Sequence, residues 1–179
     1  MSNQPFETPP MIDGYLTPTG EELATRGTRL VAAIVDGVII MLIIVPLVIL
    51  LAMIGLDLGE GLLANVVSTI FGIVAFSLVH GLLLISRGQT IGKMLFGIQI
   101  VDQESGKLLP PVRVLVIRYF WMMPLSVLTW FVPVLGTLVG LAGLVDALMI
   151  FNTDRLCLHD RLAKSKVVLF TQNRGKLDS

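Results

Sequence analysis

One long apolar run with a single carboxylate inside it constrains the fold of this chain more than any other feature. Residues 29–55 begin Arg-Leu-Val-Ala-Ala-Ile-Val-Asp and then continue almost entirely with aliphatic side chains. About 20 residues at roughly 1.5 Å each cross a hydrocarbon core of about 30 Å, so the run is long enough to span a membrane. Asp36 lies well inside it, where an ionised carboxylate costs on the order of 3 kcal/mol. The run therefore predicts a membrane helix whose carboxylate needs a partner, a proton or a bound cation.

The composition is typical of an integral membrane protein with one domain. Of the 179 residues, 54% are hydrophobic and only 15% are charged, a balance that is unusual for a soluble domain of this size. The formal net charge is zero, which argues against a nucleic-acid partner. The single cysteine, Cys157, cannot form an intrachain disulfide, and His80 and His159 lie too far apart in sequence for a zinc motif. We expect neither an enzyme nor a cofactor.

The apolar segments predict an all-α membrane fold with about four spans. The apolar region 112–152 is too long for one perpendicular helix, and Pro124 and Trp130–Pro133 interrupt it. It forms either two spans or an interfacial helix followed by one span, and we choose two. The membrane domain then covers 29–170, with spans at about 29–55, 62–86, 113–131 and 133–152, between polar tails at 1–28 and 171–179.

The basic residues predict the topology of these spans. Lysines and arginines precede the first span, follow the last span and occur in the segment 86–111, whereas the connection 56–61 has none. The positive-inside rule therefore places both termini and the segment 86–111 in the cytoplasm. Within that segment, Ile98–Val101 predicts a strand and Lys107–Leu109 a second strand in a hairpin. Lys166–Phe170, after the last span, predicts a third strand.

Four ionisable residues, one in each predicted span, fall at one depth. Asp36, His80, Arg118 and Asp146 all lie roughly 8–10 Å below the cytoplasmic surface at a helical rise of about 1.5 Å per residue. Two carboxylates against Arg118 leave about one negative charge, which a proton or a monovalent cation can neutralise. Asp36 and Asp146 are the candidate oxygen ligands for such a cation. The alternative is structural, with Asp36 paired to Arg118 or Arg29, and with His80 and Asp146 serving only in packing.

Three motifs together resemble the RDD family of bacterial membrane proteins, over about residues 26–170. The motifs are Arg29 with Asp36, Arg87-Gly88-Gln89-Thr90-Ile91-Gly92-Lys93 before Gly97–Val101, and Leu158-His159-Asp160 with Ala163. The resemblance places the family arginine on Arg29 and its first aspartate on Asp36. The second aspartate is either Asp146 or Asp160. By its own position, Asp160 also predicts a helix cap that pairs with Arg155 or Lys164.

The resemblance implies a multi-pass protein of the bacterial cytoplasmic (inner) membrane. Some members of the family are reported as cation/proton antiporters, which the resemblance permits here. We therefore predict exchange of a monovalent cation, such as sodium, for protons. Asp36 and Asp146 alternate between proton and cation, Arg118 keeps their pKa values near neutrality, and His80 relays protons.

Four helices are few for transport, so the chain is expected to form a homo-oligomer in the lipid membrane. A dimer built on the Gly136 and Gly140 face of the last span is the predicted form. Two other functions remain open. One is a non-transporting anchor or accessory subunit that assembles with another membrane protein. The other is an exporter of a small solute.

Overall fold

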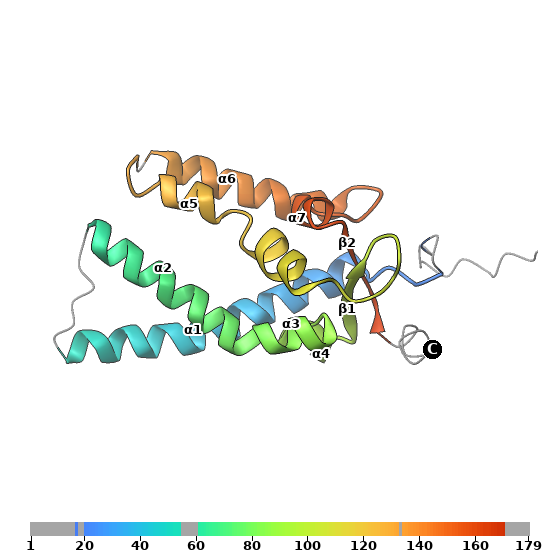
Figure 1. The fold of residues 1–179 in the computed structure, drawn as a ribbon, viewed down its shortest axis with the longest axis horizontal. Helices are drawn as coiled ribbons and strands as arrows, with labels where there is room; N and C mark the ends of the chain where they lie inside the picture. The colour runs from blue at the N-terminus through green and yellow to red at the C-terminus, as the bar shows by residue number, and fades with distance from the viewer. Residues whose placement is uncertain (1–16, 18–19, 55–60, 133, 171–179) are drawn as a thin grey trace, which may run out of the picture.

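The computed structural model describes residues 17, 20–54, 61–132 and 134–170, and it is mostly helical with one small sheet (Figure 1). One arm consists of α1 and α2, and a second arm consists of α5 and α6. Both arms extend away from the sheet, which lies at one end of the molecule, called the sheet end below. The elements in chain order are α1 (Arg26–Met53), α2 (Leu62–Phe76), η1 (Ser77–Gly81), α3 (Leu82–Arg87), α4 (Ile91–Leu95), β1 (Ile98–Asp102), η2 (Arg113–Tyr119), α5 (Met123–Leu128), α6 (Leu135–Leu148), η3 (Met149–Phe151), α7 (Leu158–Leu162) and β2 (Ser165–Leu169).

Two helices in the described part of the chain are long and apolar enough to cross a membrane. They are α1, with 28 residues, and the continuous helix Leu62–Arg87, with 26 residues, which contains α2, η1 and α3. Only 0% and 6% of their most apolar windows are buried inside the protein. Helices of this length that leave their apolar side chains uncovered need a lipid environment. This confirms that the first two predicted spans form helices of membrane-spanning length.

The apolar region 112–152 differs from the prediction of two continuous spans. The predicted span 113–131 is two short helices, η2 and α5, separated by a turn at 120–122. Pro124 stands in the first turn of α5, where its missing N–H needs no partner, and so it starts a new helix there. The predicted span 133–152 matches one apolar helix, Leu135–Phe151, which is shorter than α1 and the 62–87 helix. The second arm is therefore a broken helical hairpin.

The sheet pairs the middle of the chain with its C-terminal part. β1 and β2 are antiparallel, with Ile98 opposite Leu169 and Asp102 opposite Ser165. The predicted hairpin with Lys107–Leu109 is wrong, and the segment predicted as a third strand is the partner instead. Asp102 N donates to Lys107 O, but the rest of this edge of β1 is occupied, because Ile100 N donates to Gly88 O and Ile98 O accepts from Gln89 Nε2.

The residues just before α1 belong to the packed domain, in contrast to the predicted tail 1–28. Leu23 bridges to Val168, and Ala24 N donates to Val167 O at 3.0 Å. Ala24 is fully buried, and the Glu21 carboxylate lies 3.0 Å from Lys166 Nζ. The packed domain therefore begins before residue 29. Residues 1–16, 18–19 and 171–179, with most of the two predicted tails, lie outside the described residues.

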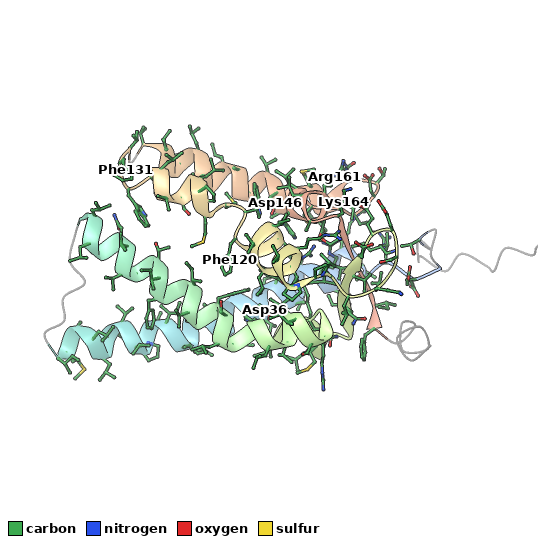
Figure 2. The ribbon with its side chains drawn as sticks, in the orientation of Figure 1. Asp36, Phe120, Phe131, Asp146, Arg161 and Lys164 are labelled. Carbon is green, nitrogen blue, oxygen red and sulfur yellow. The ribbon has the colours of Figure 1, made fainter. Side chains whose placement is uncertain are left out.

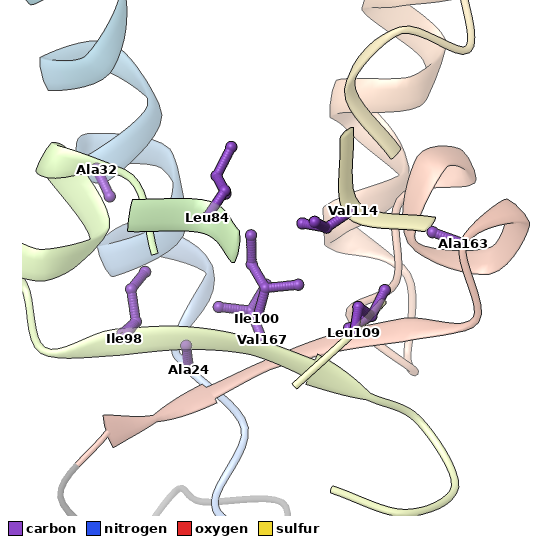
Figure 3. Close-up of a cluster of buried hydrophobic side chains, with 9 residues drawn as sticks. All are labelled: Ala24, Ala32, Leu84, Ile98, Ile100, Leu109, Val114, Ala163 and Val167. Atoms are coloured by element: carbon purple, nitrogen blue, oxygen red, sulfur yellow. The ribbon is translucent and has the colours of Figure 1, made fainter. Parts of the chain in front are cut away.

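The hydrophobic core lies at the sheet end, where the sheet meets the ends of the helices (Figure 3). Ile98, Ile100 and Val167 extend from the sheet, and Leu84 from α3 and Val114 from η2 pack against them. Each of these five side chains is at least 99% buried. The core thus joins both arms at one end, while their outer parts stay apolar and exposed.

Gly92 allows α4 to pack directly across α1. A Cβ built on Gly92 would lie 2.9 Å from Asp36 Oδ1 and would overlap the Ala32 carbonyl oxygen even more closely. Gly37 is the next residue on α1, and a Cβ there would meet nothing within 4 Å among the described residues. The two glycines therefore differ in the space around them, although they lie in the same region of the fold.

We predict that Gly92→Ala destabilises the protein by about 1–3 kcal/mol, because a methyl group pushes α4 away from α1. Gly37→Ala is the matched control and should leave the stability unchanged or slightly raised, since alanine favours a helix. Thermal unfolding in detergent, followed by tryptophan fluorescence, measures both. Equal midpoints for the two variants would contradict the packing described here.

Candidate functional site

The segment from Thr90 to Lys93 wraps around the carboxylate of Asp36. Thr90 Oγ1 donates to Asp36 Oδ2 at 2.5 Å, and Gly92 N donates to Asp36 Oδ1 at 2.7 Å. Thr90 also caps α4, because its side chain accepts from Lys93 N. These bonds replace part of the hydration that the carboxylate loses inside an apolar helix. The Asp36 side chain is left only 14% exposed.

Two cationic or protonatable side chains complete the surroundings of Asp36. Lys93 Nζ lies 3.7 Å from Asp36 Oδ2 and donates to Tyr119 Oη at 3.3 Å. His80 Nε2 lies 3.9 Å from Asp36 Oδ1. His80 Nδ1 accepts from Ile91 N at 3.4 Å, which assigns the proton of a neutral ring to Nε2, facing the carboxylate. These residues, Asp36, His80, Thr90, Gly92 and Lys93, are called the Asp36 group below.

Gly88 and Gln89 attach the Asp36 group to the sheet. Gly88 has φ +62°, a conformation that favours glycine, and its carbonyl accepts from Ile100 N at 2.8 Å. Gln89 is 2% exposed, and its Nε2 donates to Ile98 O at 2.9 Å. In return, Gln99 Nε2 donates to Arg87 O at 2.8 Å. The turn before α4 is thereby fixed to β1.

Both π-helical segments carry a buried ionisable residue. η1 contains His80, which is fully buried, and η2 contains Arg118, which is 4% exposed. A π-helical turn inserts a residue into an α-helix and rotates the side chains that follow, and such turns are common at functional sites. Here the turns point His80 toward α1 and Arg118 toward α7.

Asp160 is buried between two arginines. Arg29 from α1 and Arg118 from η2 each form a close ion pair with this carboxylate, one at each oxygen. Asp160 Oδ2 also accepts from Cys157 N at 3.2 Å, which confirms its predicted capping role. Burial raises the pKa of Asp160, but the charges of Arg118 and Arg29 outweigh it and lower the pKa below its ordinary value. The observed ion pairs of this carboxylate are therefore with Arg29 and Arg118, where the prediction named Arg155 or Lys164.

Asp146 pairs with His159 at the joint between α6 and α7. Asp146 Oδ1 accepts from His159 N at 3.0 Å, and Asp146 Oδ2 lies 2.7 Å from His159 Nδ1. Cys157 lies next to this pair and is 4% exposed. Arg29 NH2 lies 3.9 Å from Cys157 Sγ, so the joint also contacts the Asp160 ion pairs.

A pocket of about 320 Å³ lies between the two arms near these groups. Its charged and polar lining comes from α1, α4, η2, α6 and the start of α7. The lining includes Arg29, Lys93, Arg118, Tyr119, Asp146, Cys157 and His159. The pocket therefore connects the Asp36 group, through Lys93, with the joint between α6 and α7.

The structure brings the predicted polar residues to the same end of the helices but changes their partners. Asp36 is close to His80, as expected for one layer. Arg118 binds Asp160, and the predicted pairing with Asp36 or Asp146 is wrong. Asp36 lies on the α1 arm and Asp146 on the α6 arm (Figure 2), and each carboxylate has its own partners. The two aspartates therefore do not form the shared cation site that the sequence predicted.

The charge count also changes once the folded partners are known. Arg29, Lys93 and Arg118 are three cations, and three carboxylates, Asp36, Asp146 and Asp160, lie against them or their histidine neighbours. The predicted excess of about one negative charge left out two cations, Lys93 and Arg29, and one carboxylate, Asp160. With these three included, the three cations balance the three carboxylates.

The comparison with protein-family models identifies the family of this chain. The model of the RDD family matches residues 23–164. The chain belongs to the RDD family. No curated protein matches the chain in the corresponding comparison. Within this RDD chain, the matched segment contains Arg29, Asp36, Asp146 and Asp160, so it includes both the Asp36 group and the arginine pairs.

Sequence reasoning missed three residues of these sites. Tyr119 Oη accepts a hydrogen bond from Lys93 Nζ, and Ser165 Oγ accepts one from Arg118. Cys157 lies beside Asp146 and His159. None of them lies in a recognisable motif, because each becomes a neighbour only when distant segments pack. For Cys157 alone the sequence held a signal, because it lies two and three residues before His159 and Asp160, at the start of one short helix.

We predict that Asp160→Asn destabilises the protein by about 3–5 kcal/mol, because it leaves two buried guanidinium groups without a carboxylate. Asp154→Asn is the matched control, since Asp154 and its partner Arg161 have side chains that are 47% and 43% exposed. Such a surface pair contributes about 0–1 kcal/mol. Thermal unfolding in detergent separates the two variants, and an Asp160→Asn protein as stable as the wild type would refute the buried-pair assignment.

Proposed function

We propose that this RDD protein exchanges protons for a monovalent cation, such as sodium, across a bacterial cytoplasmic membrane, and that Asp36 is the exchange site. The observation that supports this is the contact between Asp36 and Lys93 at the inner end of a membrane-length helix. Ionisable residues at this depth mark ion and proton pathways in many membrane proteins.

The chemistry differs among the three carboxylates, and this selects Asp36. Asp160 is fixed by two arginines that stay protonated, so a cation has no means of displacing its partners. Asp36 faces a lysine, whose amine can lose its proton when the local charge changes. Hydrogen bonds from Thr90 and Gly92 keep the carboxylate in place when Lys93 moves.

The proposed exchange step balances charge. A sodium ion binds the Asp36 carboxylate, and the Lys93 ammonium, no longer paired, releases one proton and becomes a neutral amine. Return of a proton to Lys93 re-forms the ion pair and expels the sodium ion. One proton therefore moves for each monovalent cation, provided that the site opens alternately to the two sides. In this reading Lys93 replaces Asp146 as the exchanging partner of Asp36, and Arg118 has a structural role.

His80 is proposed to stabilise the intermediate state. Its Nε2 faces Asp36, while its Nδ1 accepts a backbone hydrogen bond from Ile91. A ring held in this tautomer can orient the carboxylate by dipole and hydrogen bonding without becoming charged. We further propose that the sheet end, with both termini, faces the cytoplasm, in line with the basic residues around it.

Proteoliposomes test the proposal. In vesicles with an imposed pH gradient, a pulse of sodium or potassium should collapse the gradient with the wild-type protein, and Asp36→Asn should abolish this activity. Asp154→Asn, which removes an exposed carboxylate, is the matched control and should behave as wild type. Exchange that persists in Asp36→Asn refutes the assignment of the site.

Lys93→Gln gives a second and independent result. It removes the ammonium group that competes with sodium for Asp36 and that carries the exchanged proton. Sodium should therefore still bind but should no longer collapse the pH gradient. Silent wild-type vesicles, together with a stoichiometric membrane protein that copurifies, would instead support the accessory-subunit function. In all cases, a single symmetrical peak in size-exclusion chromatography is required as the control for folding.

We also propose that the protein assembles as a homodimer through the glycine face of α6. Methyl groups at Gly136 or Gly140 would meet no described atom within 4 Å, so this face is uncovered within one chain. Glycines four residues apart allow two membrane helices to approach closely.

Gly140→Leu is expected to convert the dimer to a monomer, as measured by light scattering in detergent. Gly72→Leu is the matched control, because Gly72 is equally open but lies on α2. A wild-type monomer, or a Gly140→Leu protein with unchanged mass, would argue against this interface.

A further inference from the structure

Three metal-binding side chains of different chemistry meet at the joint between α6 and α7. Asp146 lies near the end of α6, Cys157 is the N-cap of α7, and His159 lies in the first turn of α7. One ligand atom from each residue lies within 4.8 Å of the other two. All three side chains also line the pocket between the arms.

We propose that Asp146, Cys157 and His159 bind a divalent transition-metal ion of the zinc class. A thiolate, an imidazole and a carboxylate are the three protein ligands that zinc uses, and a thiolate disfavours hard ions such as magnesium and calcium. The proposed site shares no residue with the Asp36 group, so it is independent of the proposed cation exchange.

The spacing of the three side chains fits such an ion after small movements. Bonds of about 2.0–2.3 Å in a tetrahedron place neighbouring ligand atoms about 3.5 Å apart. The distance from His159 Nδ1 to Asp146 Oδ2 is 2.7 Å, and the upper limit among the three ligand atoms is 4.8 Å. The metal therefore takes the place of the hydrogen that Asp146 and His159 share, and the two side chains separate slightly to admit it.

The surroundings already hold the ligands in suitable orientations. Asp146 Oδ1 is occupied by the bond from His159 N, which leaves Oδ2 for the metal. His159 Nε2 lies 3.6 Å from Asp160 Oδ1. When Nδ1 binds the metal, the ring proton moves to Nε2 and faces this carboxylate. Histidine ligands in metal sites usually donate their second N–H to a carboxylate or a carbonyl in this way.

Arg29 is the positive charge beside the Cys157 ligand of the proposed site. Its NH2 lies 3.9 Å from Cys157 Sγ, and the same group is paired with Asp160. Burial raises the pKa of the Cys157 thiol to about 11 and outweighs the effect of Arg29, which favours the thiolate, so an incoming metal has to displace the thiol proton. Binding breaks the S–H bond and forms the S–metal bond, so that one proton leaves to solvent. All three side chains line the pocket, so a water molecule there could serve as the fourth ligand.

Metal titration of the purified full-length protein tests the proposal. The protein is freed of its affinity tag, stripped with a chelator and titrated with Co²⁺, a spectroscopic substitute for Zn²⁺. We expect one ion per chain and a sulfur-to-cobalt charge-transfer band, which Zn²⁺ then removes. Cys157 is the only cysteine of the chain, so no other residue can give that band.

Variants of the three ligands decide the assignment. Cys157→Ser should remove the band, and Asp146→Asn and His159→Gln should each weaken binding at least about tenfold. Serine is a good N-cap, so Cys157→Ser preserves the start of α7. Asp154→Asn is the matched control and should bind as wild type. Absence of the band in the wild-type protein, or equal affinity in Cys157→Ser, overturns the proposal.

Asp36→Asn keeps this test separate from the test of cation exchange. This variant should bind Co²⁺ with wild-type affinity, whatever its behaviour in proteoliposomes. Loss of cobalt binding in Asp36→Asn would show that the two sites are one, which overturns the independent site proposed here.

Discussion

The burial of Asp160 between two arginines is the interaction on which the arrangement of this protein depends. A carboxylate with no exposed surface needs strong partners, because an unpaired buried charge costs several kcal/mol. Arg29 comes from the start of α1, Arg118 from η2, and Asp160 from α7. These segments lie far apart in the chain, so the ion pairs fix the first helix, the broken hairpin and the C-terminal part relative to one another. The apolar core beneath the same residues adds the burial that holds the sheet end together.

The cost of an unpaired buried charge also explains how the segment before β1 folds. Asp36 lies inside an apolar helix and cannot obtain enough water there, so the chain folds α4 back against it. Thr90 and the backbone of Gly92 supply hydrogen bonds, and Lys93 supplies a positive charge. Gly92 has a second role, because only a residue without Cβ lets the two backbones approach so closely. The motif Gly88–Lys93 is thus one structural unit that serves one carboxylate.

The two carboxylates differ in the number and kind of cationic groups that hold them. Two guanidinium groups neutralise Asp160 at all ordinary pH values, and its lowered pKa keeps it ionised. Asp36 has a lysine at 3.7 Å and a histidine at 3.9 Å, and neither contact is as close as the arginine pairs of Asp160. A buried charge with replaceable partners can respond to a mobile ion, whereas one with permanent partners stabilises the fold.

The amino-acid sequence alone determined the membrane character, the first two helices of membrane-spanning length, a strand at 98–101 and the family. Hydropathy and the spacing of apolar residues are local properties of the sequence. An apolar run such as 29–55 therefore predicts a helix without knowledge of what packs against it. Its motifs also identified Arg29, Asp36, Gly88–Lys93 and Asp160 before their contacts were known. The prediction of two continuous spans in the region 112–152 differs from the structure. The length of an apolar segment does not reveal that η2 ends in a turn and that α5 begins next to Pro124.

Only the tertiary structure decided which charges meet. Arg118 pairs with Asp160, Lys93 approaches Asp36, and β1 pairs with a strand more than 60 residues later instead of with its neighbour. Such pairings depend on where segments distant in sequence pack, and on the rotation that π-helical turns give to His80 and Arg118. Depth along a helix can be counted from the sequence, but the direction in which a side chain points around that helix is set by the partners it finds in the fold.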